Sequence, residues 1–202
     1  MFVKICGLSE RVHVFDAIEA GADAIGLVLT ASPRFVTPEM AKDLVAAAEE
    51  RVLTVGVFRD EPVAEIERLA AASGVAAVQV HGHRSRAEIA KLTGIGRKLI
   101  RAVSFDDETL EENFGENMLL VDAPKPGSGE SWDYAAMSEL ELADVRGRWL
   151  LAGGLTPDTV AGAIAAASPW GVDVSSGIET APGQKSSELI RRFVHAARSA
   201  SE

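Results

Sequence analysis

Eight short apolar runs recur at similar intervals along the chain, and no other feature restricts its fold as strongly. Most of them are nearly continuous in Val, Ile and Leu, as is typical of strands that are buried on both faces. They span residues 2–6, 24–29, 52–58, 76–81, 99–104, 118–122, 149–153 and 171–176. We interpret them as eight strands of a parallel sheet.

Segments with helical character lie between the runs. Thr37, Pro38 and Glu39 give one of them an N-cap, a proline at the first helical position and an acidic first turn. Residues 156–158 repeat this start with Thr, Pro and Asp. The helix expected within 104–117 is the least regular, because that segment is short and very acidic.

Strand and helix thus alternate through the whole chain. Its 202 residues leave about 25 per unit, close to the minimum for a strand, a helix and two short loops. Eight such units predict an α/β fold, a single (β/α)8 TIM barrel that covers residues 1–202 as one domain. A doubly wound open sheet is the alternative, but the chain has neither a domain-splitting linker nor a GxGxxG motif after its first strand.

Composition restricts the class of partner. The formal net charge is −10 and no basic cluster stands out, which disfavours nucleic-acid binding. The single cysteine, Cys6, rules out an internal disulfide and a cysteine-rich metal site, and it suits a reducing, cytoplasmic location. We find no leader and no apolar run near the roughly 18 residues of a membrane span, so we expect no membrane partner. We expect the acidic run 106–116 to be a solvated face, and His13, His83 and His195 to lie at the surface.

Polar residues gather where the predicted strands end. In a barrel of this kind the active site forms at the carboxyl ends of the strands. Cys6, His81 and Asp122 end the first, fourth and sixth runs. Arg34 follows the second run, and Asp173 lies in the eighth. Because an acid and a base that face each other across a pocket are suited to proton transfer, we predict an active site at this rim.

Cys6 and Asp122 also have plainer interpretations. A free cysteine is usually buried and inert. Lys4 points to the same side of its strand as Cys6, however, and an ammonium there would favour the reactive thiolate. Asp122 could instead cap the next helix or pair with Lys125. We favour a catalytic role for both Cys6 and Asp122.

Two roles remain open for each of the other polar residues at the rim. Arg34 is either a solvated loop charge or a binding group for a carboxylate, whose planar shape a guanidinium matches. His81 either orients its neighbours or bonds a strand-end carbonyl. Asp173 either holds loop backbone in place or reaches a substrate.

Glycine-rich loops follow the last two runs. Gly153 and Gly154 form one of them, and Ser175, Ser176 and Gly177 begin the other. Loops at these two places in a barrel often bind phosphate through backbone N–H groups and a helix N-terminus. We therefore predict that these five residues bind a phosphorylated small molecule.

Taken in order along the chain, these motifs resemble those of the phosphoribosylanthranilate isomerase family, enzymes of tryptophan biosynthesis with a (β/α)8 fold of the ribulose-phosphate-binding type. The matching stretches run from residue 4 to residue 185. They read KICGL, GADAIGLV, SPRFV, VGVF, VQVHG, LLVDA, LAGGLTPDTV and GVDVSSGIETAPGQK. The combination of KICG, SPR and the last stretch is specific to the family.

The resemblance implies an Amadori rearrangement of N-(5-phosphoribosyl)anthranilate to 1-(2-carboxyphenylamino)-1-deoxyribulose 5-phosphate. Asp122 would be the general acid that opens the ribose ring, and Cys6 the general base that removes the C2′ proton. Arg34 would bind the anthranilate carboxylate, and the glycine loops the phosphate. No metal or cofactor is implied, and we expect a monomer or a homodimer.

The loop after the sixth run departs from the family. It reads PGSGESWDYAAM, where family members carry a stretch similar to GGTGKTFDW. Gly127 and Gly129 align as substrate-binding residues, but Glu130 replaces the family lysine and Tyr134 the family tryptophan. This leaves open altered phosphate binding or a second substrate, such as the aminoaldose of the histidine pathway. The histidine-pathway isomerase itself ends its first strand on an aspartate rather than on a cysteine. A non-catalytic barrel would be expected to lack the acid or the base.

Overall fold

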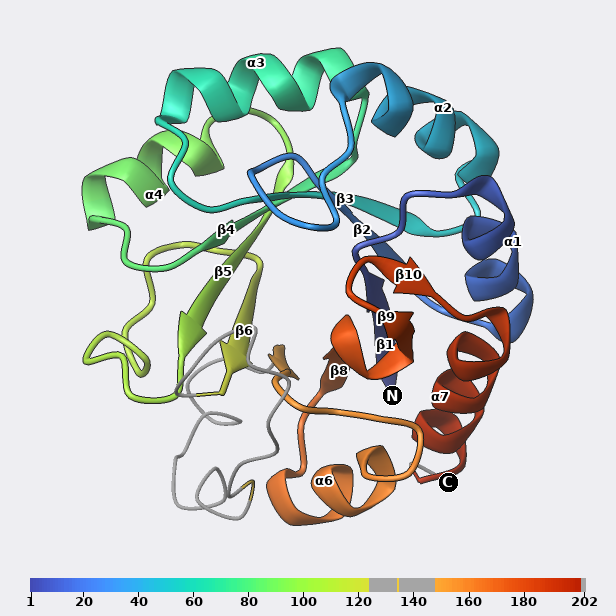
Figure 1. The fold of residues 1–202 in the computed structure, drawn as a ribbon. Helices are drawn as coiled ribbons and strands as arrows, with labels where there is room; N and C mark the ends of the chain where they lie inside the picture. The colour runs from blue at the N-terminus through green and yellow to red at the C-terminus, as the bar shows by residue number, and fades with distance from the viewer. Residues whose placement is uncertain (124–133, 135–147, 201–202) are drawn as a thin grey trace.

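The eight predicted strands close into a parallel barrel in a computed structural model that describes residues 1–123, 134 and 148–200. Each strand pairs with the next along the chain, and β8 pairs with β1 to complete the ring (Figure 1). The strands are β1 (Phe2–Cys6), β2 (Ala24–Val28), β3 (Leu53–Phe58), β4 (Ala77–His81), β5 (Lys98–Ser104), β6 (Met118–Asp122), β7 (Trp149–Leu151) and β8 (Gly171–Val174). The predicted (β/α)8 fold is confirmed.

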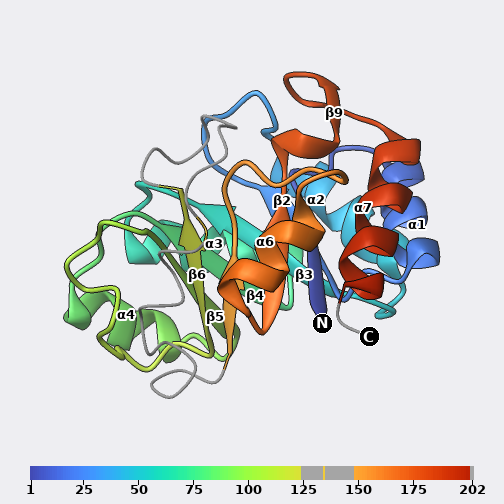
Figure 2. The same cartoon turned by 90° about the horizontal axis from the view of Figure 1, so that it is seen from below.

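Helices cover the outside of the barrel (Figures 1 and 2). They are α1 (Arg11–Ala20), α2 (Pro38–Ala48), α3 (Val63–Ser73), α4 (Arg86–Thr93), α6 (Val160–Ala167) and α7 (Ser187–Ser199). Among the described residues, no helix is long and apolar enough to cross a membrane.

The predicted start of α2 is confirmed, whereas the predicted start of α6 is wrong. Thr37 caps α2 by accepting from the Met40 backbone N–H, with Pro38 at the first helical position. The helix α6, in contrast, begins at Val160 rather than at Pro157. The hydroxyls of Thr156 and Thr159 each accept the other residue's backbone N–H, and this closed turn delays the helix.

The fifth unit has no helix, which corrects the expectation for 104–117. Residues 105–117 form turns around Arg101, which points outward from β5 and is 1% exposed. Its guanidinium donates to Glu116 and to the Thr109 hydroxyl, and it lies 4.7 Å from the centre of the Phe114 ring. The loop folds onto a buried charge instead of an apolar helix face. The acidic run is therefore not solvated throughout, because the Glu116 carboxylate is buried against Arg101.

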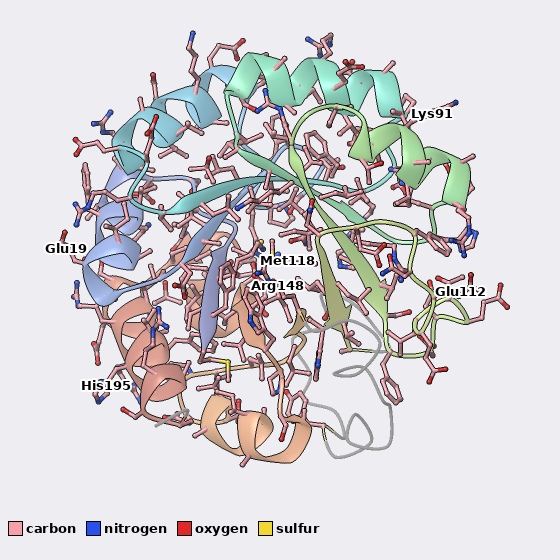
Figure 3. All side chains as sticks on the ribbon, turned by 180° about the vertical axis from the view of Figure 1, so that it is seen from behind. Glu19, Lys91, Glu112, Met118, Arg148 and His195 are labelled. Carbon is pink, nitrogen blue, oxygen red and sulfur yellow. The ribbon has the colours of Figure 1, made fainter. Side chains whose placement is uncertain are left out.

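Two layers of apolar side chains make up the core. Residues that point outward from the strands pack under the helices, while alternate residues fill the barrel, including Ala24, Ile100 and Leu120. Seen from behind, Met118 lies near the middle of the barrel and His195 on the outside of α7 (Figure 3). His83 and His195 are exposed as predicted, but His13 is wrong: it is buried in α1.

Candidate active site

A pocket of about 130 Å³ opens at the carboxyl ends of the strands. It brings together six residues that the sequence predicts for the site, namely Cys6, Arg34, His81, Asp122, Asp173 and Ser175. A wider hollow of about 530 Å³ adjoins it, and Ser32, Arg34 and Arg59 line both. The predicted rim is thus a real concavity, with polar groups from strands on opposite sides of the barrel.

Cys6 is the last residue of β1 and is 7% exposed. Strand β2 leaves room for its sulfur at Gly26, where a Cβ would lie 2.7 Å from Cys6 Sγ. Burial raises the pKa of the Cys6 thiol; Lys4 opposes that rise, Asp173 adds to it, and Lys185 opposes it. The net pKa is raised, so the effect expected from Lys4 has the right sign but is outweighed by burial.

A buried ion pair lies next to Cys6. Lys4 on β1 is fully buried, and its Nζ lies 2.8 Å from Oδ1 of Asp173, its partner in the β1–β8 ladder. Burial alone would lower the pKa of Lys4, but the charges of Asp173 and Cys6 raise it above its ordinary value. Lys4 is therefore an ammonium inside the barrel, held by Asp173.

Asp122 ends β6, three strands away from β1 around the ring. Its Oδ1 accepts from the Ala123 backbone N–H at 2.8 Å, and its Oδ2 lies 3.2 Å from Nε2 of His81. His81 thus contacts a neighbouring side chain, in line with the orienting role considered for it. Lys125, the other partner considered for Asp122, lies outside the described residues.

Arg34 lies in the loop between β2 and α2 and is paired with Glu179. Arg34 Nε donates to Oε1 at 2.6 Å, and Nη2 donates to Oε2 at 2.8 Å. Glu179 begins a short hairpin of β9 (Glu179–Ala181) and β10 (Gln184–Lys185) that follows β8. Arg34 is accordingly not a freely solvated charge. Its guanidinium is already paired with Glu179 when no substrate is bound.

Glu179 holds two cations. Besides Arg34 it accepts from Lys185 Nζ at 2.7 Å, and Lys185 in turn donates to the Ser175 carbonyl at 2.8 Å. Burial would raise the pKa of Glu179, but its bonds to Arg34 and Lys185 lower it to about 2. Burial lowers the pKa of Lys185, and Glu179 opposes that change. The stretch GIETAPGQK contains both charges, yet sequence reasoning did not single them out.

The two glycine loops lie against each other. Gly153 and Gly154 have φ of +86° and +66°, a region that favours glycine. A Cβ on Gly177 would lie 1.8 Å from the Leu155 carbonyl oxygen, so the second loop packs directly on the first. Tyr134 donates its hydroxyl to the Gly153 carbonyl at 2.8 Å. The predicted residues Gly127 and Gly129, and Glu130 with them, lie outside the described residues.

Gln79 is a pocket residue that the predicted set omits. It is 3% exposed, lines the pocket, and has no partner for Oε1 within the described part of the chain. It precedes His81 by two positions on β4, so both face the same side. A polar residue within an otherwise apolar run was the available signal. The described residues contain no cluster of three or more His, Cys, Asp or Glu that could hold a metal ion.

Known proteins share this sequence and this architecture. Residues 3–196 match the family model described as N-(5′-phosphoribosyl)anthranilate (PRA) isomerase. The N-(5′-phosphoribosyl)anthranilate isomerase of Pelobacter propionicus is 40% identical over 206 residues, which cover 97% of this chain and 95% of that protein.

Solved structures agree with this match. TrpF from Jonesia denitrificans has 44% identity and a TM-score of 0.87, with 100% of this chain and 98% of that chain covered. A phosphoribosyl anthranilate isomerase in complex with reduced 1-(o-carboxyphenylamino)-1-deoxyribulose 5-phosphate has 30% identity and a TM-score of 0.87, with 98% and 99% covered.

Proposed function

Because the chain belongs to the N-(5′-phosphoribosyl)anthranilate isomerase family, we propose that Asp122 and Cys6 catalyse the Amadori rearrangement of N-(5′-phosphoribosyl)anthranilate. The chain is an isomerase of tryptophan biosynthesis, and its product would be 1-(o-carboxyphenylamino)-1-deoxyribulose 5-phosphate. The observation that carries the proposal is that a carboxyl on β6 and a thiol on β1 line one small pocket.

Asp122 acts as the general acid. It gives a proton to the ribose ring oxygen, the bond from that oxygen to C1′ breaks, and the anthranilate nitrogen forms a Schiff base with C1′. The Oδ1 bond to the Ala123 N–H fixes the carboxyl, and His81 orients Oδ2. The carboxyl group of Asp122 thus keeps the same orientation while it transfers the proton.

Cys6 acts as the general base. Its thiolate removes the proton from C2′, which gives an enolamine. The enolamine becomes the ketone when C1′ receives a proton and the C2′ hydroxyl loses one. Burial raises the pKa of the thiol and so makes its thiolate a stronger base, while Lys4 limits the cost of that charge. Atoms balance, because the ring oxygen and C1′ each gain a proton while C2′ and its hydroxyl each lose one. The broken bond between C1′ and the ring oxygen is replaced by the C2′ carbonyl bond.

The substrate's two anionic groups bind at opposite ends. The Arg34 guanidinium binds the anthranilate carboxylate. Backbone N–H groups around Gly153, Gly154, Ser176 and Gly177 bind the phosphate. Gly127 and Gly129 belong to this proposal from the sequence alone. The oligomeric state, monomer or homodimer, stays a prediction.

An assay with phosphoribosylanthranilate generated in place tests the proposal. We expect the wild type to consume the fluorescent substrate, while Cys6→Ser and Asp122→Asn keep the fold and lose turnover by at least about 10²-fold. Circular dichroism checks the fold of each variant. Near-normal turnover by either folded variant would remove that residue from the mechanism, and no turnover by the folded wild type would contradict the proposed reaction.

A further inference from the structure

We propose that Glu179 is a positioning residue for substrate binding, which fixes the Arg34 guanidinium so that its remaining edge faces the substrate carboxylate. The inference rests on the proposed function, in which Arg34 binds that carboxylate. Glu179 lines the adjoining hollow but is not among the described residues that line the active-site pocket, whereas Arg34 lines both. The Glu179 carboxylate already accepts from Arg34 and Lys185 and would repel a substrate anion, so Glu179 acts through Arg34.

The Glu179 carboxylate has a full set of donors. Oε1 accepts from Arg34 Nε and Lys185 Nζ, and Oε2 accepts from Arg34 Nη2 and the Gly183 backbone N–H at 3.2 Å. Its side chain is only 5% exposed. Since a carboxylate offers about four acceptor positions, this one cannot rotate without losing bonds that water would not replace.

A fixed carboxylate gives Arg34 a fixed direction. The guanidinium is planar and carries five N–H donors, of which Glu179 engages one on Nε and one on Nη2. Three donors remain, two on Nη1 and one on Nη2, and the edge formed by these two nitrogens is left for a second carboxylate. Because the group is rigid, orienting one edge orients the other.

Backbone packing fixes the distance between the two loops. Gly183 has φ of +81°, and a Cβ there would lie 2.6 Å from the Pro33 carbonyl oxygen. The hairpin that carries Glu179 thus rests on the loop that carries Arg34. Figure 2 shows both segments at the same end of the barrel, opposite the N-terminus. The Arg34–Glu179 pair is therefore placed by the main chain as well as by its own charges.

Charge balance favours the same role. Arg34 and Lys185 both contact Glu179, so the cluster keeps one net positive charge before a ligand arrives. A substrate carboxylate would neutralise it. Without Glu179, the two cations would repel each other and Arg34 would lose its orientation.

The test measures binding of reduced 1-(o-carboxyphenylamino)-1-deoxyribulose 5-phosphate by calorimetry to four forms: wild type, Arg34→Ala, Glu179→Gln and the double variant. We expect each single variant to raise Kd by about tenfold or more. If Glu179 acts through Arg34, the double variant binds about as weakly as Arg34→Ala alone. If the two effects multiply instead, Glu179 acts independently and the proposal is overturned.

A second ligand separates positioning from general damage to the fold. The same compound without the carboxylate, reduced 1-phenylamino-1-deoxyribulose 5-phosphate, should bind wild type and Glu179→Gln within about twofold of each other. An equal loss of both ligands in Glu179→Gln would indicate a merely structural role and would overturn the inference. Glu179→Asp, which keeps the charge, should recover part of the affinity for the carboxylated ligand.

The chain offers a matched control. Arg68 and Glu65 on α3 form a pair with similar hydrogen-bond distances, 2.8 and 2.7 Å, but both side chains lie at the surface. Glu65→Gln should leave Kd unchanged. Failure of the proposed function would look different, because Arg34→Ala would then bind the carboxylated ligand as well as wild type does.

Discussion

The single thiol of Cys6 can be followed directly at the residue scale, because no other cysteine competes for a reagent. Burial raises its pKa. We expect alkylation by iodoacetamide to accelerate with pH beyond about pH 8.5, the pKa of an ordinary cysteine. Mass spectrometry of samples quenched at successive times, from pH 6 to 10, measures the rate of alkylation.

Two controls frame this measurement. The urea-unfolded chain should reach its plateau at lower pH than the folded protein, since unfolding removes the burial that raises the pKa. Cys6→Ser should take up no label. A plateau below pH 8 in the folded protein would show that Lys4 and Lys185 outweigh burial.

A substitution at Gly177 tests whether the close packing of the two glycine loops contributes to the stability of the protein. Gly177→Ala would place a methyl group 1.8 Å from the Leu155 carbonyl oxygen, so we expect a loss of about 1–3 kcal/mol in the free energy of unfolding. Urea denaturation measures it. Gly162→Ala on α6 is the control, because a Cβ there meets nothing within 4 Å and alanine favours the helix. Equal stability of both variants would mean that the loops can separate.

Residues that act through distant partners were the hardest to predict. Cys6, His81 and Asp122 could be placed at the rim because each ends an apolar run. Glu179 and Lys185 could not, because their roles depend on Arg34, which lies 145 positions before Glu179. No local pattern encodes that contact, and a charged residue in a loop is most simply read as solvated.

The fifth βα unit shows the same limit at the scale of an element. The buried part of β5, residues 99–103, is apolar except for Arg101, and the acidic stretch after the strand lacks the periodicity of a helix. Only the structure shows that this arginine is buried and that the loop folds around it through hydrogen bonds to Glu116 and to the Glu112 carbonyl. Elements that bury an apolar face, such as α2 and α7, followed from the sequence, whereas one organised by a buried charge did not.

Arg101 should therefore matter far more for stability than a neighbouring surface arginine. Arg101→Met removes the cation that faces the buried Glu116, and we expect a loss of about 3–5 kcal/mol in the free energy of unfolding. Arg86 also lies over the Phe114 ring and pairs with Glu112, but both side chains of that pair are exposed. Arg86→Met should cost less than about 1 kcal/mol. Similar losses in the two variants would contradict the role given to burial.

For the whole molecule, the alternation of eight apolar runs with helical segments was enough to predict the barrel. Each parallel strand pairs with the next, and the pairing of β8 with β1 closes the ring, so that the barrel has no edge strand. The bounds of the last two strands were overestimated: β7 ends at Leu151 and β8 at Val174, where the chain turns into the glycine loops. Small residues follow both strands, Ala152 and Gly153 after β7 and Ser175 and Ser176 after β8, and such residues occur at strand ends as well as in loops.

The resistance of the whole molecule to acid should depend on Glu179. Its pKa is about 2 in the folded protein and ordinarily near 4.5, so the unfolded chain binds the proton more tightly. The stabilisation is present above pH 4.5 and is lost as the pH falls from there toward 2. Glu179→Gln should be less stable at pH 7 by about 1–3 kcal/mol and should lose less on acidification.

Urea unfolding at pH 7, 4 and 3 measures this difference. The surface variant Glu65→Gln serves as the comparison, and its stability should change with pH as in the wild type. A Glu179→Gln curve parallel to the wild type across the acid range would show that Glu179 titrates normally.

The ion pair between Lys4 and Asp173 joins the first strand of the barrel to the last, across 169 positions of the chain. During folding, such a contact forms only when the ends of a very long loop meet, and closing that loop costs conformational entropy. The surroundings of Cys6, which include Lys4 and Asp173, are therefore complete only after β1 and β8 have paired. A nascent polypeptide should acquire activity only when β8 has docked, so that the appearance of turnover marks the end of folding.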